Sequence, residues 1–399
     1  VQKLSVYNDK LYRDALTGAY NFNTDAFWKN FLRDLELGQL DNTEGYVCAT
    51  VPQTGPAGIG FISMLGWGNA VTILPEMMYR QFGDEEALPR QYESMKLFVE
   101  AEIRKMGKKN LWIGPSLGDW LAMGKGIAWQ AMHNNPVSNA FIVHDLKVIS
   151  ETAEWLGKRE DAARYRRQLA ATTDAYIKKF VSKNGIVAKD YQSAYIMALK
   201  YVLPEGELRE RVRKNFVANI RKNGLQTGFF ATEHLLSLLV EAGEQKLAYD
   251  VLLQENCPGW MYQVKCGATT TWERWDALKP DGTVNEEKMA GSGENMVSFN
   301  HYAFGSVGEF YYQYILGIRP EKPGFAKLHF APYPDERLGG VSGSYLSVAG
   351  KIESAWRYEP DGCHIRLATP VEAVVLLPDG RSENVPAGTY EWTVKRPNL

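Results

Sequence analysis

Apolar and polar residues alternate with the period of an α-helix over the first three-quarters of the chain. Apolar side chains recur three or four residues apart, as at Phe27, Phe31 and Leu35, which places them on one face of a helix. Glycine or proline follows several of these segments and ends them. The pattern predicts a helix that ends at Gly83 and further helices at 24–38, 92–106, 139–156, 159–180, 191–202, 207–223, 232–242, 245–254 and 297–316.

The pattern changes to a period of two residues after about position 316. In Lys351–Tyr358 the side chains of Ile352, Ser354 and Trp356 share one face, and charged residues occupy the other. Such alternation is typical of a strand with one buried face. Further strand-like runs, separated by Pro-Asp-Gly turns, lie at 363–367, 373–377 and 388–394. We therefore expect a mainly α domain at 1–316 and a small antiparallel β-sandwich at 317–399.

Short turns alternate with longer loops between the predicted helices. In a ring of helical hairpins the short turns lie at one end and the long loops collect at the other. Roughly 12 helices of average length would occupy the first 315 residues. The pattern thus predicts an (α/α)6 toroid, with one pocket surrounded by the loops at Gly66–Asn69, Gly118–Trp120, Cys257–Asp276 and Asn300–His301.

The composition of the chain excludes several classes of function. A net charge of −2 gives no basis for binding nucleic acid or an anionic membrane, and no apolar run approaches the roughly 18 residues of a membrane span. No signal peptide is visible. The four cysteines are scattered and form no CxxC pair, so we expect buried free thiols, although Cys257 and Cys266 are close enough in sequence to be bridged. The histidines lack metal-binding spacing, and no cofactor is predicted.

The segment CGATTTWERWD, Cys266–Asp276, combines two tryptophans with two carboxylates and an arginine. Tryptophan rings stack on the C–H faces of sugars, and a nearby carboxylate bonds hydroxyl groups or transfers a proton. Glu273 is therefore the candidate catalytic residue of a sugar-cleaving site. From its immediate neighbours alone, a surface ion pair with Arg274 is the more common role for such a glutamate.

Several motifs together resemble one family. TTTWERWD is followed by NMVSFNHYAFGSVGEFYYQYILGI, and AYNFNTDAFWKNFLRDL, GWGNA, YRQFGD, LGDWLA and LQTGFFATEHLL precede it in order. The chain resembles the bacterial α-L-rhamnosidases of glycoside hydrolase family 78. This resemblance implies an (α/α)6 barrel followed by a β-sandwich, and inverting hydrolysis of terminal α-L-rhamnosides with Glu273 as general base. The expected partner is a rhamnose-containing oligosaccharide or glycoside.

Other candidates lie in the same loops and would stack on a sugar or bond its hydroxyl groups. Asp119 is equally suited to capping a helix. Trp272 and Trp275 have the spacing of a buried stripe, and we expect Trp272 to form the pocket wall. The resemblance places His301 against the sugar. The predicted substrate-binding residues are Trp67, Asn69, Asp119, Trp120, Trp260, Tyr262, Trp272 and His301.

The chain departs from the family pattern at two places. An inverting mechanism needs a second carboxyl group roughly 6.5–9.5 Å from the base. At the expected position Val1–Asp9 contains Lys3, and Tyr7-Asn8-Asp9 only weakly resembles the family's Trp-Thr-Gly-Asp. Either the acid lies upstream of Val1 or it has been lost. Asn69 stands where the family has Asp.

Two alternatives therefore stay open. The first is a non-catalytic or degenerate homologue that binds a rhamnose-containing glycan. The second is another α-toroid glycosidase or a lyase, for which a basic pocket would be expected.

Overall fold

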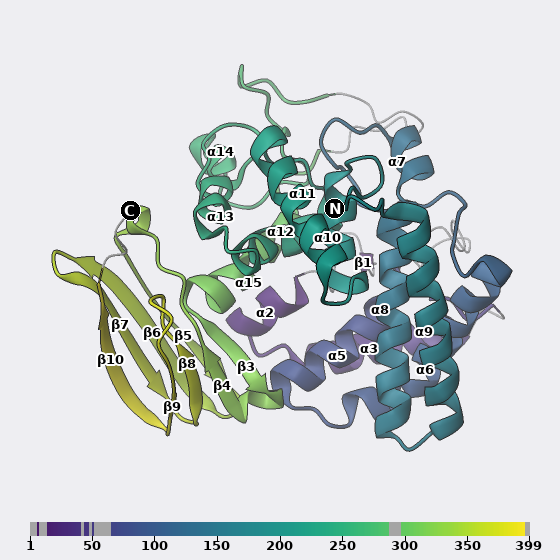
Figure 1. Ribbon diagram of the computed structural model, residues 1–399, viewed down its shortest axis with the longest axis horizontal. Helices are drawn as coiled ribbons and strands as arrows, with labels where there is room; N and C mark the ends of the chain where they lie inside the picture. Colours follow the sequence, from purple (N-terminus) through teal and green to yellow (C-terminus); the bar gives the residue numbers. More distant parts are fainter. Residues whose placement is uncertain are drawn as a thin grey trace. The chain divides into compact units, whose positions relative to one another are not determined.

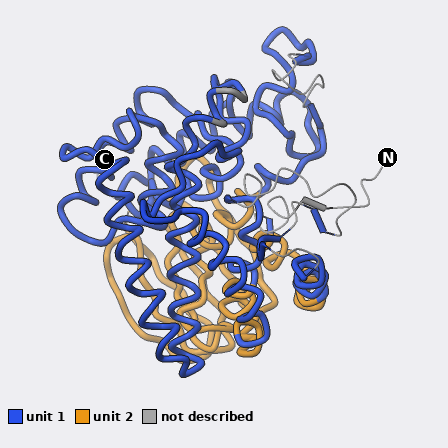
Figure 2. Tube along the Cα trace, turned by 90° about the vertical axis from the view of Figure 1, so that its right-hand side faces the viewer, with its two compact units in different colours: residues 1–14, 30–74, 89–305 blue, residues 15–29, 75–88, 306–399 orange. Residues whose placement is uncertain are grey.

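The computed structural model describes residues 6–7, 14–40, 44–47, 50–51, 65–286 and 297–395. The chain divides into two compact units (Figure 2). Unit 1 comprises 1–14, 30–74 and 89–305, and unit 2 comprises 15–29, 75–88 and 306–399.

The described elements are mainly helical before residue 316 and mainly strands after it (Figure 1). The helices are α2 (Ala15–Asn21), α3 (Asp25–Leu40), α5 (Ala70–Phe82), α6 (Ala87–Met106), α7 (Ile127–His133), α8 (Asn135–Trp155), α9 (Arg159–Phe180), α10 (Gln192–Met197), α11 (Glu207–Asn223), α12 (Phe229–Glu241), α13 (Gln245–Leu252), α14 (Trp260–Lys265) and α15 (Val307–Phe310). The strands are β1 (Val6–Tyr7), β2 (Thr50–Val51), β3 (Ile318–Lys322), β4 (Lys327–Phe330), β5 (Gly340–Ser347), β6 (Gly350–Glu359), β7 (Gly362–Thr369), β8 (Ala373–Leu376), β9 (Ser382–Val385) and β10 (Gly388–Val394).

Helix periodicity located most of these helices. The bounds of α9 and α11 are those predicted, and α8 begins at Asn135 rather than at 139. Phe27 is an exception, because its side chain is 51% exposed although Phe31 and Leu35 on the same helix are buried.

The helix predicted over 297–316 was wrong in its first part. Residues 297–301 form no helix, and beyond them lie a short 3-10 turn (Tyr302–Ser306), α15 and a π-helical turn (Tyr311–Ile315). The reason is tertiary, since the backbone N–H of Glu273 donates to Ser298 O at 2.8 Å and that of His301 donates to Thr271 O at 2.8 Å. These long-range bonds replace the bonds that a helix would form.

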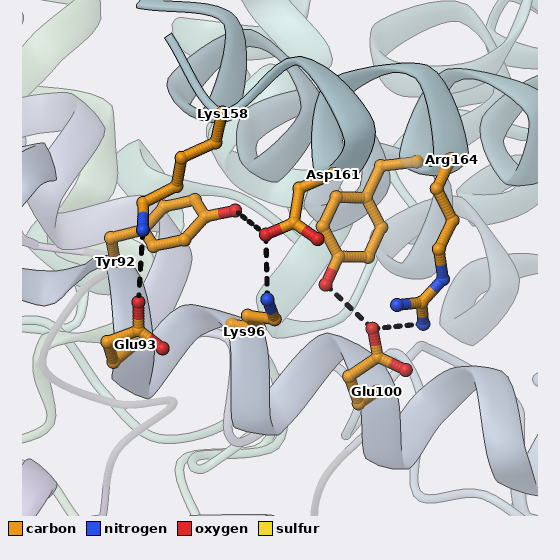
Figure 3. Close-up of polar contacts among 8 residues, drawn as sticks. Tyr92, Glu93, Lys96, Glu100, Lys158, Asp161 and Arg164 are labelled. Atoms are coloured by element: carbon orange, nitrogen blue, oxygen red, sulfur yellow. Dashed lines mark hydrogen bonds and ion pairs between the residues drawn. The ribbon is translucent and has the colours of Figure 1, made fainter. Parts of the chain in front are cut away.

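In unit 1, α8 packs along α9 and is buried over most of its length. A row of polar contacts joins α6 to α9 (Figure 3). The Tyr92 hydroxyl and the Lys96 ammonium both contact Asp161 Oδ2, at 2.8 and 2.7 Å. One turn further along, the Tyr165 hydroxyl donates to Glu100 at 2.7 Å. The row stabilises one relative register of the two helices.

In unit 2, two four-stranded sheets have the orders β10-β7-β6-β5 and β3-β4-β8-β9. The predicted face of β6 is confirmed, since Ile352, Ser354 and Trp356 are buried, and the Trp356 indole N–H donates to Ile315 O at 2.7 Å. The pairing is antiparallel except between β4 and β8, which are parallel. The predicted small antiparallel sandwich therefore contains one parallel pair, because the link between β4 and β8 passes through the other sheet.

Three of the cysteines lie in the described part of the chain, and all three are free thiols. Cys363 is buried as expected, whereas Cys266 is exposed and Cys257 is half-buried. Cys48 lies outside the described residues. No helix among the described residues has the length and apolar character needed to cross a bilayer.

Candidate active site

The start of α12, at Thr227–Ala231, is the point in unit 1 where the four predicted loops meet. Asp119, from the second loop, is fully buried, and its carboxylate accepts the backbone N–H groups of Gly228 (2.8 Å), Phe230 (2.5 Å) and Ala231 (3.1 Å). The Ser193 hydroxyl is a fourth donor, at 2.5 Å. These bonds satisfy the donors that a helix leaves free at its N-terminus. Asp119 is therefore a cap rather than a sugar ligand, and its predicted direct role is corrected.

The first loop contacts α12 through Trp67. The Trp67 ring is perpendicular to the rings of Trp120 and Phe230, with centroids 5.9 Å apart in both pairs. Trp67 is only 6% exposed, and its indole N–H has no hydrogen-bond partner among the described residues. Trp120 is partly exposed. Two of the predicted sugar-contacting rings thus lie together at the start of α12.

The third and fourth loops place Glu273 beside His301. The Glu273 carboxyl group is nearly buried, with its Oε1 4.0 Å from His301 Nε2. The backbone N–H of Ala303 donates to His301 Nδ1 at 3.2 Å, so the neutral ring carries its proton on Nε2, on the side of the carboxylate. On its other side the His301 ring stacks on Phe229, with centroids 5.1 Å apart. Glu273 and His301 are therefore held as a pair against α12.

The aromatic residues of the third loop are largely buried, and Tyr262 and Trp272 belong to one apolar core. Trp272 is 2% exposed and packs against Tyr262 and Phe299. The Tyr262 hydroxyl donates to Leu278 O at 2.9 Å. The indole N–H of Trp260 donates to Phe304 O, also at 2.9 Å. The prediction of Trp272 as pocket wall is corrected, because its ring is buried in this packing. Trp260 and Tyr262, which are 6% and 7% exposed and so no more buried than Trp67, stay predicted stacking residues.

Trp275, which was expected in the core, is fully buried. Its ring stacks on Phe304 at 3.8 Å, and its indole N–H donates to Thr227 O at 3.0 Å. Arg274, the next residue after Glu273, donates two hydrogen bonds to the Asp276 carboxylate, at 2.6 and 2.9 Å. Arg274 thus pairs with Asp276, and Glu273 is buried rather than in a surface ion pair.

Asn69 is also inaccessible to a sugar, since its side chain is fully buried. Its amide donates to the Asp145 carboxylate and its carbonyl oxygen accepts the Gly66 N–H at 2.7 Å. Thr72 is a second donor to Asp145. Glu102, also buried, reaches the same carboxylate. Burial raises the pKa of Asp145 to about 7, and burial together with the Asp145 charge raises the pKa of Glu102 well above its usual value.

Phe229, Glu102 and Asp145 were missed at the sequence level. Glu102 and Asp145 lie inside the helices predicted at 92–106 and 139–156, and Phe229 lies just before the helix predicted at 232–242. Nothing in their immediate neighbours marked any of them as part of a site. For Asp145 the one available signal was a charged residue within an otherwise apolar helix. Most of Val1–Asp9, where an acid was expected and Lys3 stands, lies outside the described residues.

Comparison with known families agrees with this architecture. Residues 6–315 match the bacterial α-L-rhamnosidase six-hairpin glycosidase domain. The chain belongs to this family. Residues 317–390 match the C-terminal domain of bacterial α-L-rhamnosidases.

Two curated α-L-rhamnosidases are similar to this chain in sequence. The chain is 33% identical over 360 residues to an α-L-rhamnosidase of Alteromonas sp. (strain LOR), covering 88% of this chain and 38% of that protein. It is 31% identical over 390 residues to one of Formosa agariphila, covering 94% and 40%. The chain thus spans less than half the length of these rhamnosidases.

Solved rhamnosidase structures share the fold. The α-L-rhamnosidase of Streptomyces avermitilis, complexed with L-rhamnose, superimposes with a TM-score of 0.87 at 28% identity, covering 98% of this chain and 38% of that one. The enzyme of Aspergillus terreus gives 0.89, also at 28% identity, covering 98% and 45%. The predicted fold class, a six-hairpin helical domain followed by a β domain, is confirmed.

Proposed function

We propose that the protein containing this chain hydrolyses terminal α-L-rhamnosides by an inverting mechanism, with Glu273 as the general base. The observation that carries the proposal is the Glu273–His301 pair, placed in the chain of a rhamnosidase family member where four loops meet. A carboxylate that is nearly buried and lies beside an imidazole N–H is suited to take a proton from an attacking water.

The residues around the pair divide into two roles. His301 would orient the Glu273 carboxylate, since its protonated nitrogen lies 4.0 Å from Oε1 and a small movement would bring the two into hydrogen-bond distance. Trp67 and Trp120 would contact the sugar: the Trp67 indole N–H lacks an acceptor among the described residues, and a substrate hydroxyl would supply one. The proton for the leaving oxygen must come from a second carboxyl group.

The test uses the full protein and an aryl α-L-rhamnoside. Replacing Glu273 by Gln keeps the size of the side chain but removes its basicity, so kcat should fall by about 10²–10⁴-fold. Proton NMR of the first turnovers should show L-rhamnose released as the opposite anomer. Glu255→Gln is the matched control, because Glu255 is exposed and pairs only with Lys265 among the described residues, and its kcat should equal that of the parent.

Two outcomes would contradict the proposal. Normal turnover by the Glu273→Gln variant would remove Glu273 from the reaction, and release of the same anomer would exclude inversion. A glycan-binding role without cleavage is favoured by Lys3 at the position expected for an acid. Calorimetric binding of a rhamnose-containing oligosaccharide that the parent protein never cleaves would establish that role instead.

We further propose that the boundary between the catalytic and C-terminal domains lies at 316/317. The ends of the two family matches, at 315 and 317, support it.

A further inference from the structure

Asp119 accepts more hydrogen bonds than the capping of one helix requires. Its carboxylate crosses from one loop to another and collects four donors, three from the start of α12 and one from Ser193. The two loops touch closely, since a Cβ added to Gly228 would lie 2.2 Å from Trp120 O. Gly118 and Leu121, on either side of Asp119, have φ values of +50° and +58°. The loop is thus held in a strained shape by these contacts.

The capped turn continues directly to the Glu273–His301 pair. Phe229 lies between the capped residues Gly228 and Phe230, and its backbone N–H donates to Trp120 O at 3.0 Å. Its ring stacks on His301, whose Nε2 lies 4.0 Å from Glu273 Oε1. A shift in the start of α12 would therefore move the ring on which His301 rests.

We propose that Asp119 is a positioning residue for the Glu273–His301 pair. It fixes the first turn of α12, the turn fixes Phe229, and Phe229 sets the orientation of the His301 imidazole beside the Glu273 carboxylate. This inference rests on the proposed function, because it assigns the purpose of the positioning to the general base.

The chemistry of the cap requires a carboxylate. Every group that reaches Asp119 is a donor, and a carboxylate is the side chain that only accepts. In Asp119→Asn the amide NH₂ would replace one oxygen and face either the Gly228 N–H or the N–H groups of Phe230 and Ala231. A donor would then oppose a donor, and the first turn of α12 would be displaced.

Kinetics of the full protein test the proposal. We expect Asp119→Asn to lower kcat about 10–100-fold, because displacements near 1 Å cost about that much, with KM changed less than about threefold. Val212→Ala, at a fully buried position on α11, is the control for lost stability and should lower Tm without changing kcat. If kcat of folded Asp119→Asn equals that of the parent, Asp119 is only a cap and the proposal is overturned.

Phe229→Leu keeps the cap and removes the aromatic ring. It should reduce kcat as Asp119→Asn does, and the double variant should lose little more than either single variant. Fully additive losses would refute the relay. Parent-like kcat for Phe229→Leu would refute it even if Asp119→Asn does not fold.

A readout independent of activity separates this proposal from the proposed function. The ¹⁵N chemical shifts of His301 should change in Asp119→Asn, while those of His364, on the exposed face of β7, should not. Changed shifts in a protein without hydrolase activity would overturn the proposed function alone. Unchanged shifts in an active enzyme would overturn the positioning role alone.

Discussion

Replacing Glu102 by Gln tests whether two buried carboxyl groups share a proton. Glu102 on α6 and Asp145 on α8 are both fully buried. No donor among the described residues reaches either oxygen of Glu102, whereas Asp145 accepts from Asn69 and Thr72. A protonated Glu102 would donate to the Asp145 carboxylate. In Glu102→Gln the side-chain amide would donate to that carboxylate at every pH.

The sign and size of the effect follow from the raised pKa values. A carboxyl group whose pKa is raised by folding binds more protons in the folded state, so the free energy of unfolding falls as pH rises. For Asp145 the fall spans the range from its unfolded pKa of about 4 to about 7. For Glu102, whose pKa is raised well above its usual value, the effect has the same sign. Each extra proton that the folded state holds contributes about 1.4 kcal/mol per pH unit, so the parent loses stability relative to a variant without that proton as pH rises.

Denaturant unfolding of the parent and of Glu102→Gln at several pH values measures this difference. We expect the variant to gain stability relative to the parent as pH rises from 6 to 8, by at most about 1.4 kcal/mol per pH unit for one proton. Glu100→Gln is the control, since Glu100 lies on the same helix but bonds Tyr165 and Arg164 at the surface. A difference between parent and Glu102→Gln that does not change with pH would refute the shared proton.

Two further predictions concern the packing of unit 1. Gly228→Ala should lower the free energy of unfolding by more than about 3 kcal/mol, because its Cβ would overlap Trp120 O, whereas Gly38→Ala, with open space around it, should be neutral or stabilising in denaturant unfolding. Asp161→Asn should cost about 0.5–1 kcal/mol at pH 7, since the Lys96 bond lowers the pKa of Asp161 and its stabilisation is present above the unfolded pKa. That difference should vanish in unfolding measured near pH 2, and its persistence there would contradict the ion pair.

Periodicity and turn residues determined the elements of this fold because both are local. The bounds of α9 and α11 follow from apolar spacing and from the residues that end each helix. Where long-range bonds compete with local preference, the prediction failed. Residues 297–301 have the sequence of the start of an aromatic-rich helix, yet they bond to the Thr271–Glu273 segment instead.

The same distinction between local and long-range information applies to the candidate site. The sequence by itself determined the family, the Glu273 motif and the loops that carry the site, since these depend on residue type and order. Only the tertiary structure decided which loop residues are free to contact a ligand. Asn69, Asp119 and Trp272 have the chemistry of sugar ligands, but burial assigns them to a buried carboxyl cluster, a helix cap and a core. Burial depends on contacts between segments far apart in sequence, and local spacing carries no information about those contacts.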